Sequence, residues 1–375
     1  MNVLAISYGR NLFNALNPER KRQHECASVV ESLHIIVFAR SKENLTPVQD
    51  GNLFVYPTGG NTKIGMLIRG FFLGQKLLQQ HKHKEFIITT QDPFEAGMVG
   101  YALARLFNLP LNIQEHGDFF STTHWRQETI LNRLRYYLGL FLLSRAHTVR
   151  VVSKRIKNTL IQKGIVEDKI RELSVAVPIN KFLEAPASPV ARDLFAPESI
   201  IMLSVARFVS QKNLPLLIHA FARAYKNEPR LRLLLIGEGP EKLKLAQMIT
   251  KLFPHNNSEL VIKIIPWTND VPGYMKSVDL YALSSNYEGY ARVLPEAMAS
   301  GLPIVTTSVG CVGEVCLPKE HALVVPIDDT TAFADALLVL AHDTELQQRF
   351  KQKSVSTMEF LTNGHDYPTR WLKAL

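Results

Sequence analysis

The sequence predicts an α/β protein with two domains, each built around a mainly parallel sheet. Short apolar runs of strand length alternate with helical patterns along most of the chain. The chain has 375 residues, which is enough for two domains that each bury a core. A stretch rich in proline and small residues, 177–199, interrupts the alternation near the middle. We therefore expect an N-terminal domain over 1–180, a C-terminal domain over 181–360 and a final helix over 361–375.

The composition argues against a membrane-spanning or disulfide-rich protein. The mean hydropathy is −0.01, and no apolar run approaches the eighteen or more residues that cross a bilayer. The first residues, MNVLAISYGRNLF, lack the features of a signal peptide, so we expect a cytoplasmic location. Cys26, Cys311 and Cys316 are too few for a disulfide framework, and with His321 they fall short of a zinc pattern, so we expect reduced structural thiols.

The positive charge is concentrated in the first half of the chain. Residues 1–180 hold 23 lysines and arginines against 14 acidic residues, whereas residues 181–375 hold 20 of each. This asymmetry indicates that the first half faces an anionic partner: membrane headgroups, a phosphate-bearing acceptor or nucleic acid. Nucleic acid is the least favoured of these, because no recognition module is visible and the basic loops lack interleaved aromatic residues.

The N-terminal domain begins with a buried strand at 3–7. No G-x-G-x-x-G follows this strand, which counts against a nicotinamide-dependent enzyme. Asn17 and Pro18 suit the cap and first position of a helix through about residue 33. Later apolar runs predict further strands, which helical patterns separate, at 34–39, 53–56, 86–89, 111–114 and 148–152.

Two of the separating helices, expected over 63–81 and 129–144, are both basic and apolar. The simpler interpretation is that each buries one face against the sheet and presents a cationic outer face to water. The alternative is that one of them lies on an anionic membrane surface, because basic amphipathic helices bind there through apolar area and charge.

Three loops of this domain follow strands: 58–61, 91–93 and 115–118. The third is the most informative, because His116 follows a strand end and precedes a glycine. Its imidazole is therefore expected to project from the carboxyl edge of the sheet. A lone histidine is by default a surface or core residue, and Asp118 is a weaker candidate for function.

The C-terminal domain repeats the alternation, starting with a strand at 200–205. Its next loop, 206–213, carries Arg207 and Lys212 before a helix through about residue 225. Two cations at the start of a helix form an anion site suited to a diphosphate. Further strands are predicted at 231–236, 260–265 and 322–326, with helices over most of 330–375.

The most informative stretch of this domain runs from residue 283 to 315 and contains Glu288 and Glu296. A short strand at 278–283 leads into a loop, and a helix whose first turn holds Pro295 carries the second glutamate. In open α/β sheets, ligands bind outside the carboxyl ends of the strands. A carboxylate there can accept hydrogen bonds from two neighbouring hydroxyls and hold a sugar diol in one orientation.

The R-x4-K string from Arg207 to Lys212, followed by the E-x7-E string from Glu288 to Glu296, resembles the retaining glycosyltransferases of family 4. The resemblance covers the second domain with specific motifs and the first by loop order and His116. It implies the GT-B fold, with two Rossmann-like domains facing each other across a cleft. It also implies transfer of a sugar from a nucleotide-diphosphate sugar to a hydroxyl acceptor with retention of configuration.

The resemblance also implies roles for individual residues. Arg207 and Lys212 would stabilise the departing diphosphate, Glu288 would hold donor-sugar hydroxyls, and Glu296 would hold the ribose diol. His116 would contact the sugar near the reacting carbon. The remaining donor-binding positions that it implies are Gly237, Gly239, Trp267, Gly289 and Tyr290, with Trp267 beside the base. No metal and no cofactor are expected.

The resemblance further suggests a lipid-linked or polysaccharide acceptor and a role in cell-surface polysaccharide or glycolipid synthesis. The location it suggests is the cytoplasm, with peripheral docking on the inner face of the plasma membrane. In this architecture the last helix crosses back to the first domain. Two alternatives share the fold: a nucleotide-sugar epimerase, and a non-catalytic relative that binds nucleotide sugars.

Overall fold

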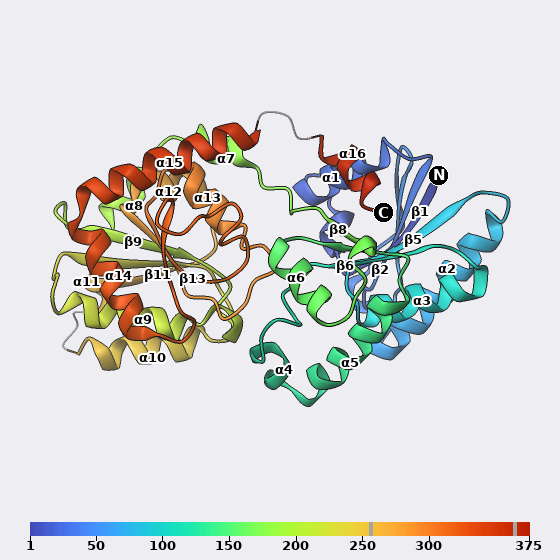
Figure 1. Cartoon of the computed structure of the whole chain (residues 1–375), viewed down its shortest axis with the longest axis horizontal. Helices are drawn as coiled ribbons and strands as arrows, with labels where there is room; N and C mark the ends of the chain where they lie inside the picture. Colours follow the sequence, from blue (N-terminus) through green and yellow to red (C-terminus); the bar gives the residue numbers. More distant parts are fainter. Residues whose placement is uncertain (255–257, 363–365) are drawn as a thin grey trace. The chain divides into compact units, whose positions relative to one another are not determined.

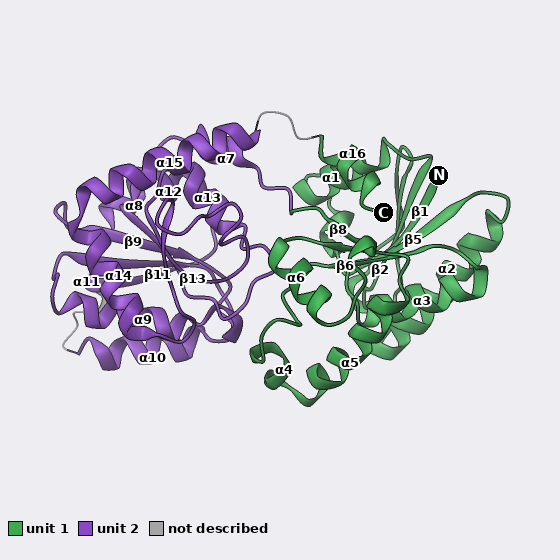
Figure 2. Ribbon diagram, viewed as in Figure 1, with its two compact units in different colours: residues 1–174, 366–375 green, residues 175–365 purple. Residues whose placement is uncertain are grey.

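A computed structural model describes residues 1–254, 258–362 and 366–375 of the chain. The chain divides into two compact units (Figure 2). The first contains Met1–Ser174 and Asp366–Leu375, and the second contains Val175–His365. The units therefore separate after Ser174, before the boundary that the sequence suggested at residue 180. The last ten residues of the chain are part of the first unit.

The first unit is built on an eight-stranded sheet in the order β3-β4-β2-β1-β5-β6-β7-β8. Figure 1 labels β1, β2, β5, β6 and β8 of this sheet. All neighbouring strands are parallel except β3 and β4, which pair antiparallel. Neither β3 nor β8 was predicted from the sequence. The strands are β1 (Asn2–Ser7), β2 (Ser32–Val37), β3 (Val48–Asp50), β4 (Leu53–Pro57), β5 (Phe86–Thr90), β6 (Leu111–Glu115), β7 (Thr148–Val151) and β8 (Ile170–Glu172).

Helices connect these strands at the expected places. The first, α1, ends at Ala27 rather than near residue 33, because β2 already begins at Ser32. Thr62 and Thr129 cap the two basic helices by accepting hydrogen bonds from backbone amides. The helices are α1 (Pro18–Ala27), α2 (Lys63–Gln80), α3 (Glu95–Phe107), α4 (His124–Glu128), α5 (Ile130–Arg145), α6 (Lys154–Gln162) and α16 (Tyr367–Lys373), with 3₁₀ turns η1 (Arg10–Phe13), η2 (Ser41–Glu43) and η3 (Glu167–Lys169).

The C-terminal helix α16 packs beside α1 in the first unit. Trp371 is buried in the same apolar cluster as Cys26 of α1 and Val3 of β1. Tyr367 accepts a hydrogen bond from the buried Arg150 of β7 through its hydroxyl, at 2.8 Å. Side-chain burial and this hydrogen bond together hold the end of the chain on the first sheet.

The second unit contains a fully parallel six-stranded sheet in the order β11-β10-β9-β12-β13-β14. The strands are β9 (Ile200–Val205), β10 (Leu231–Ile236), β11 (Ile262–Ile265), β12 (Leu280–Leu283), β13 (Ile304–Thr307) and β14 (Ala322–Val325). The chain runs outward from β9 to β11 and then returns to β12 on the other side of β9. The strand order therefore reverses between β9 and β12, which is where open α/β sheets bind ligands.

The second unit also includes the stretch that the sequence marked as a link. Residues 177–199 form two short helices, α7 and α8, which pack on α13, α15 and α12 of this unit. Residues 258–261 are helical and not part of the strand expected there. The helices are α7 (Ile179–Leu183), α8 (Pro189–Asp193), α9 (Leu214–Tyr225), α10 (Lys242–Leu252), α11 (Ser258–Val261), α12 (Val271–Ser277), α13 (Val293–Ala299), α14 (Thr330–His342) and α15 (Thr344–Thr362), with one 3₁₀ turn, η4 (Ser210–Lys212).

Several expectations from composition can be compared with the structure. All three cysteines are buried and free of disulfides, as predicted. None of the helices within the described ranges is long and apolar enough to cross a membrane. The same part of the chain contains no group of three or more His, Cys, Asp or Glu side chains that could hold a metal ion.

Candidate functional site

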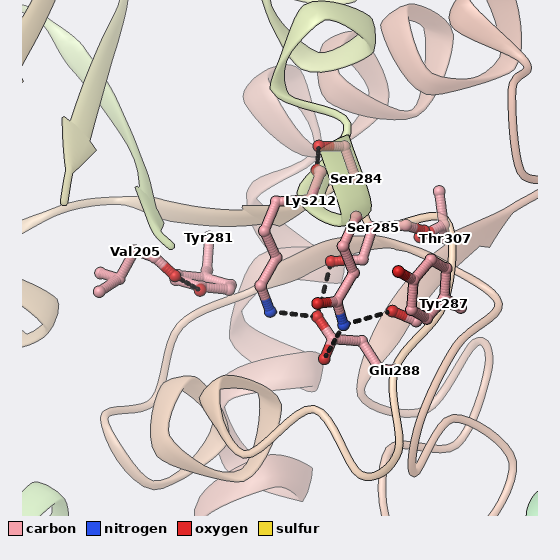
Figure 3. Close-up of polar contacts among 9 residues, drawn as sticks. Val205, Lys212, Tyr281, Ser284, Ser285, Tyr287, Glu288 and Thr307 are labelled. Carbon is pink, nitrogen blue, oxygen red and sulfur yellow. Dashed lines mark hydrogen bonds and ion pairs between the residues drawn. The ribbon is translucent and has the colours of Figure 1, made fainter. Parts of the chain in front are cut away.

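The candidate site lies at the carboxyl edge of the second sheet, where the strand order reverses. The loop 206–213 leaves β9, and the loop 284–292 leaves its parallel neighbour β12. Figure 3 shows Lys212 of the first loop and Glu288 of the second directed toward each other. The fold thus brings together two of the residues that the sequence singled out, although they lie far apart along the chain.

Glu288 is a buried carboxylate with several polar partners. Its Oε1 forms an ion pair with Nζ of Lys212 and accepts a hydrogen bond from Oγ of Ser285 at 2.7 Å. Its Oε2 lies 3.4 Å from Nε2 of Gln211, which also donates to the carbonyl of Tyr287 at 3.0 Å. These contacts compensate the buried charge and fix the orientation of the carboxylate.

Further hydrogen bonds hold the two loops together. The backbone amide of Asn286 donates to the carbonyl of Gln211 at 2.8 Å, and Oγ of Ser284 donates to the carbonyl of Lys212 at 2.9 Å. Thr307 of β13 donates to the carbonyl of Ser285 at 2.7 Å. Sequence reasoning missed the supporting roles of Gln211, Ser284 and Ser285. The pair of serines directly after a buried strand was the available signal, because hydroxyls there can bond neighbouring backbone groups.

Arg207 differs from Lys212 in its surroundings. Its side chain is exposed, and it forms no ion pair or hydrogen bond with any residue that the structure describes. The start of α9 is less open than the sequence suggested, since Oδ1 of Asn213 accepts from the Leu216 amide at 3.4 Å. Asn213 also donates to Asn286 at 2.8 Å, which ties the helix start to the second loop. Arg207 is therefore a cation of this edge that is available to an anionic ligand.

Glu296 lies in the first turn of α13, and its side chain is 12% exposed. Within the described residues, its one ion-pair partner is Arg292, with Nη2 and Oε1 3.5 Å apart. Burial raises the pKa of the Glu296 carboxyl to about 7, while the positive charges of Arg292 and Lys181 partly lower it. Glu288 and Glu296 therefore differ: the first has strong partners and the second has a weak one.

The predicted glycines of the β10 turn approach backbone closely. A Cβ atom at Gly237 would lie 1.9 Å from the carbonyl oxygen of Ala206, and one at Gly239 would lie 2.4 Å from that of Phe208. The Phe208 amide donates to the carbonyl of Glu238 at 2.8 Å. These glycines hold the loop that carries Arg207, so their close approach has a structural reason independent of a nucleotide.

The other predicted donor-binding positions lie along the same edge. Gly289 and Tyr290 are buried, and the Tyr290 carbonyl accepts a hydrogen bond from the Cys311 amide at 2.9 Å. Ala291 follows with φ of 60°, a conformation that is uncommon without glycine. Trp267, in the loop after β11, is 61% exposed. An exposed indole at a sheet edge is available for stacking on a planar ligand.

His116 lies just after β6, at the carboxyl edge of the first sheet. Its Nε2 is 2.9 Å from Oε1 of Gln114, an oxygen that also accepts from the guanidinium of Arg150. An amide oxygen only accepts, so Nε2 of the imidazole carries the hydrogen and Nδ1 remains an acceptor. Burial, together with Arg150 and Arg22, lowers the pKa of His116 to about 3, so this side chain is neutral at physiological pH.

The neighbouring acids of this loop are also buried. Glu115 has no exposed area, and burial followed by the charge of Asp118 raises its pKa well above the usual range. Burial likewise raises the pKa of Asp118. In the 91–93 loop, burial raises the pKa of Asp92 to about 6, and its Oδ1 accepts from the Phe94 amide at 2.6 Å. The carboxyl edge of the first sheet therefore contains carboxyl groups that favour the protonated form.

Comparison with known families finds a match within the second unit. Residues 191–356 match the family of group 1 glycosyl transferases. Among curated relatives, the lipopolysaccharide core biosynthesis glycosyltransferases LpsE and LpsD of Rhizobium meliloti are each 28% identical, over 42% and 51% of this chain and 44% and 55% of their own lengths. The chain thus spans about half the length of these relatives. An uncharacterized glycosyltransferase of Haemophilus influenzae is 26% identical over 72% of each chain.

Solved structures resemble the whole chain. Anabaena HepE in complex with UDP-glucose aligns over 100% of both chains with a TM-score of 0.75 and 19% identity. Sucrose-phosphate synthase from Thermosynechococcus elongatus aligns over 100% of this chain and 98% of its own, with a TM-score of 0.80 and 16% identity. The likeness confirms the predicted GT-B fold, with two parallel-sheet α/β domains. The family match and the relatives together show that the second unit is similar to glycosyltransferases.

Proposed function

We propose that the protein transfers a sugar from a nucleotide-diphosphate sugar to a hydroxyl acceptor, with retention of configuration. The observation that carries this proposal is the compensated Lys212–Glu288 pair, with the unpartnered Arg207 on the same loop as Lys212. A cation without a partner in the protein can bind a diphosphate, and a carboxylate held in one orientation can bind a diol. UDP and UDP-glucose occupy complexes of the similar structure HepE, which supports this class of donor.

In this proposal each residue has one role. Arg207 and Lys212 stabilise the negative charge that develops on the departing diphosphate. Glu288 holds hydroxyls of the donor sugar, and Glu296 accepts hydrogen bonds from the ribose diol. His116, neutral and with Nδ1 free to accept, contacts the transferred sugar. The charge on the diphosphate is offset by side chains, so we propose that the reaction needs no bound metal and no further cofactor.

A thermal-shift panel tests the donor site. UDP, GDP, ADP and their common sugar conjugates are added with and without Mg²⁺ to the wild type and to Arg207→Ala. A ligand that binds only the folded state at about a hundredfold over its Kd stabilises it by roughly 2.7 kcal/mol. We expect a base-selective, metal-independent shift that Arg207→Ala loses. The variant itself keeps the wild-type melting temperature, because Arg207 has no partner within the described residues.

Transfer activity is the second readout for the same variant. Removing one group that stabilises developing charge typically slows a reaction by about 10²- to 10³-fold. We expect a loss of this size for Arg207→Ala once a donor and an acceptor have been identified. Near-normal turnover in this variant contradicts the assignment of Arg207.

Two other activities on the same fold remain alternatives. A nucleotide-sugar epimerase converts the donor without an acceptor, so product analysis in the absence of acceptor separates it from a transferase. A non-catalytic relative binds the donor and releases it unchanged. The charged groups Arg207, Lys212, Glu288 and Glu296 are all present, which favours a catalyst over such a relative.

The acceptor belongs, we propose, to cell-surface polysaccharide or glycolipid synthesis. Curated relatives include lipopolysaccharide core glycosyltransferases and a Campylobacter jejuni enzyme whose name specifies a diphospho-undecaprenol substrate. A lipid-linked acceptor of this kind is anionic and membrane-bound. The excess positive charge of residues 1–180 is compatible with both properties.

The first unit carries features that support docking on an anionic membrane from the cytoplasmic side. On α2, Ile64, Ile68 and Phe72 recur every four residues and are 70%, 52% and 60% exposed. On α5, a second exposed apolar stripe contains Ile130, Leu134, Tyr137 and Phe141. Cations flank these stripes, including Lys63, Arg69 and Arg133, all of which are exposed. The sequence favoured a cationic outer face, and the structure adds exposed apolar stripes to it.

Liposome flotation tests the docking. We expect the protein to float with vesicles that contain anionic lipid and to remain unbound with neutral vesicles. Ile68→Ser/Phe72→Ser on α2 should weaken flotation with an unchanged fold, because both side chains are already exposed. Leu243→Ser on α10 of the second unit, also an exposed apolar position, is the matched control. If the protein floats with neither anionic nor neutral vesicles, the result argues against a membrane role.

A further inference from the structure

The second carboxylate of the site, Glu296, is influenced by two cations that the family motif does not include. Arg292 comes one helical turn earlier on α13 and contacts Oε1 at 3.5 Å. Lys181 comes from α7, a short helix that packs on α13. Both positive charges act on the Glu296 carboxyl. Arg292 is 46% exposed and Glu296 is 12% exposed, so the pair lies at the surface of the site with the acid on its inner side.

Glu296 has fewer stabilising partners than Glu288, so its charged form depends more on these cations. Glu288 has an ion pair with Lys212 and a 2.7 Å hydrogen bond from Ser285. Glu296 has only the longer Arg292 contact within the described chain, although it is similarly buried. A buried carboxylate without strong partners favours the neutral form, and its pKa is already near 7. A neutral carboxyl accepts hydrogen bonds from a diol less strongly than a carboxylate does.

We propose that Arg292 and Lys181 are positioning residues that keep Glu296 ionised and oriented to accept both hydroxyls of the ribose diol. This rests on the proposed function, in which Glu296 binds the donor ribose. The two cations act through Glu296 and need not touch the ligand. Donor affinity should then vary with pH around neutrality. The charges of Arg292 and Lys181 should determine the pH at which this change occurs.

The other charged and titratable groups around Glu296 do not replace these cations. Tyr281 of β12 is fully buried, and its hydroxyl is directed to the Val205 carbonyl at 3.5 Å. Burial raises the pKa of Tyr281, and the charges of Glu296 and Glu288 add to the rise, so this hydroxyl stays neutral. β13 has no titratable side chain, and Lys351 of α15 packs against Gly301, beyond the last turn of α13. Arg292 and Lys181 are thus the cations whose charge acts on Glu296.

The test compares binding of two probes, UDP and 2′,3′-dideoxy-UDP, to the full chain between pH 5.5 and 8.5. For the wild type we expect UDP to bind more weakly as pH falls through about 7, and more steeply than the probe without the diol. Both probes share the titration of the terminal phosphate at about pH 6, so the difference between their profiles reports the diol contact. Arg292→Gln should move the UDP midpoint to higher pH. Moving the midpoint from about 7 to about 8 lowers the ionised fraction of Glu296 at pH 7 from about one half to about one tenth, so UDP binding at that pH weakens about fivefold. Lys181→Gln should give a smaller movement in the same direction, and Arg292→Lys should restore most of the wild-type profile.

Two controls accompany these variants. Arg232→Gln removes the same charge at the start of β10, on the opposite edge of the sheet, and should leave both probes unaffected. Glu296→Gln should reduce the pH dependence of UDP binding to that of the dideoxy probe while the protein stays folded. Melting temperatures of all variants report whether any loss of binding reflects unfolding.

Three results would overturn the proposal. An Arg292→Gln profile identical to the wild type removes the role of Arg292. A pH-independent loss that is equal for both probes means that Arg292 contacts the phosphates directly rather than acting through Glu296. A wild-type chain that binds none of UDP, GDP and ADP overturns the proposed function, and this inference with it. The first two results leave the proposed function intact, so the two failures are distinguishable.

Discussion

Glu288 of the second unit and Glu115 of the first are both buried carboxyl groups at the carboxyl edge of a parallel sheet, but their surroundings are opposite. Glu288 has an ion pair and a 2.7 Å hydrogen bond. Glu115 is fully buried, and neither oxygen has a hydrogen bond of normal geometry within the described residues, although the nearby Phe119 amide offsets part of its pKa rise. The comparison shows that burial at a sheet edge does not by itself produce a charged site. Compensating partners do.

The strongest test of the edge that contains Glu288 removes one member of the Lys212–Glu288 ion pair. Lys212→Met leaves the Glu288 charge buried and unpaired, which should lower the free energy of unfolding by about 3–5 kcal/mol. The double variant Lys212→Met/Glu288→Gln removes both charges and should recover much of this loss. Chemical denaturation of the wild type, both single variants and the double variant measures the coupling. Additive single effects would mean that the ion pair contributes nothing in solution.

The rigidity of the same edge can be tested at Gly237. An added Cβ would lie 1.9 Å from the Ala206 carbonyl oxygen, so the loop that carries Arg207 must move. We expect Gly237→Ala to destabilise the protein by about 2–3 kcal/mol and to weaken nucleotide binding. The matched control is Gly164→Ala in the first unit, where φ is also positive, at 88°, but no atom lies within 4 Å of the new Cβ. Equal losses at both positions would show that backbone conformation alone, and not crowding, determines the effect.

The edge that contains Glu115 can be tested through the pH dependence of the protein's stability. The pKa of Glu115 is raised in the folded state, so the unfolded chain loses this proton first as pH rises. Stability is therefore complete below the unfolded pKa, near 4.5, and falls above it by up to about 1.4 kcal/mol per pH unit. Glu115→Gln should reduce this slope and stabilise the protein at pH 7 to 8. Denaturation at pH 5, 6, 7 and 8 measures both slopes, and Glu172→Gln, on the exposed end of β8, is the control. Unchanged slopes in Glu115→Gln would mean that this carboxyl is ionised in the fold.

The smallest expected effect concerns His116 of the same edge. Burial and the nearby arginines lower its pKa to about 3, so the imidazole should not titrate between pH 5 and 8. Its NMR signals should remain at neutral-form positions across this range. A His116 titration near pH 6.5 would show that the ring is not held by Gln114 and Arg150 as described.

The two edges also differ in how much of them the sequence could predict. In the second unit, Arg207, Lys212, Glu288 and Glu296 were identified together through the resemblance of the R-x4-K and E-x7-E strings to a known family. The strand order that makes the loops after β9 and β12 neighbours came only from the structure. In the first unit, the position of His116 after a strand was predicted, but its neutral state was not. That state depends on Gln114 of β6 and Arg150 of β7, and no local pattern indicates that these side chains meet.

Errors in the predicted elements have a common cause. α1 ends at Ala27, and residues 177–199 fold into helices packed on the second unit. In both cases the prediction used only the local sequence pattern. The boundary of the element depends instead on which surface the neighbouring strand or helix covers. The apolar stripe of α2 is a similar case. Periodicity identified the helix, but only its packing showed that Ile64, Ile68 and Phe72 remain exposed.

The sequence alone determined that the chain alternates strands and helices, that its net charge lies in the first half, and that two cations precede two carboxylates in the second. These are properties of local pattern and order. Only the tertiary structure decided that Lys212 pairs with Glu288, that Arg292 and Lys181 act on Glu296, and that Glu115 has no strong partner. The physical reason is that charge compensation and burial depend on distances between strands that are neighbours in the sheet but far apart in the chain.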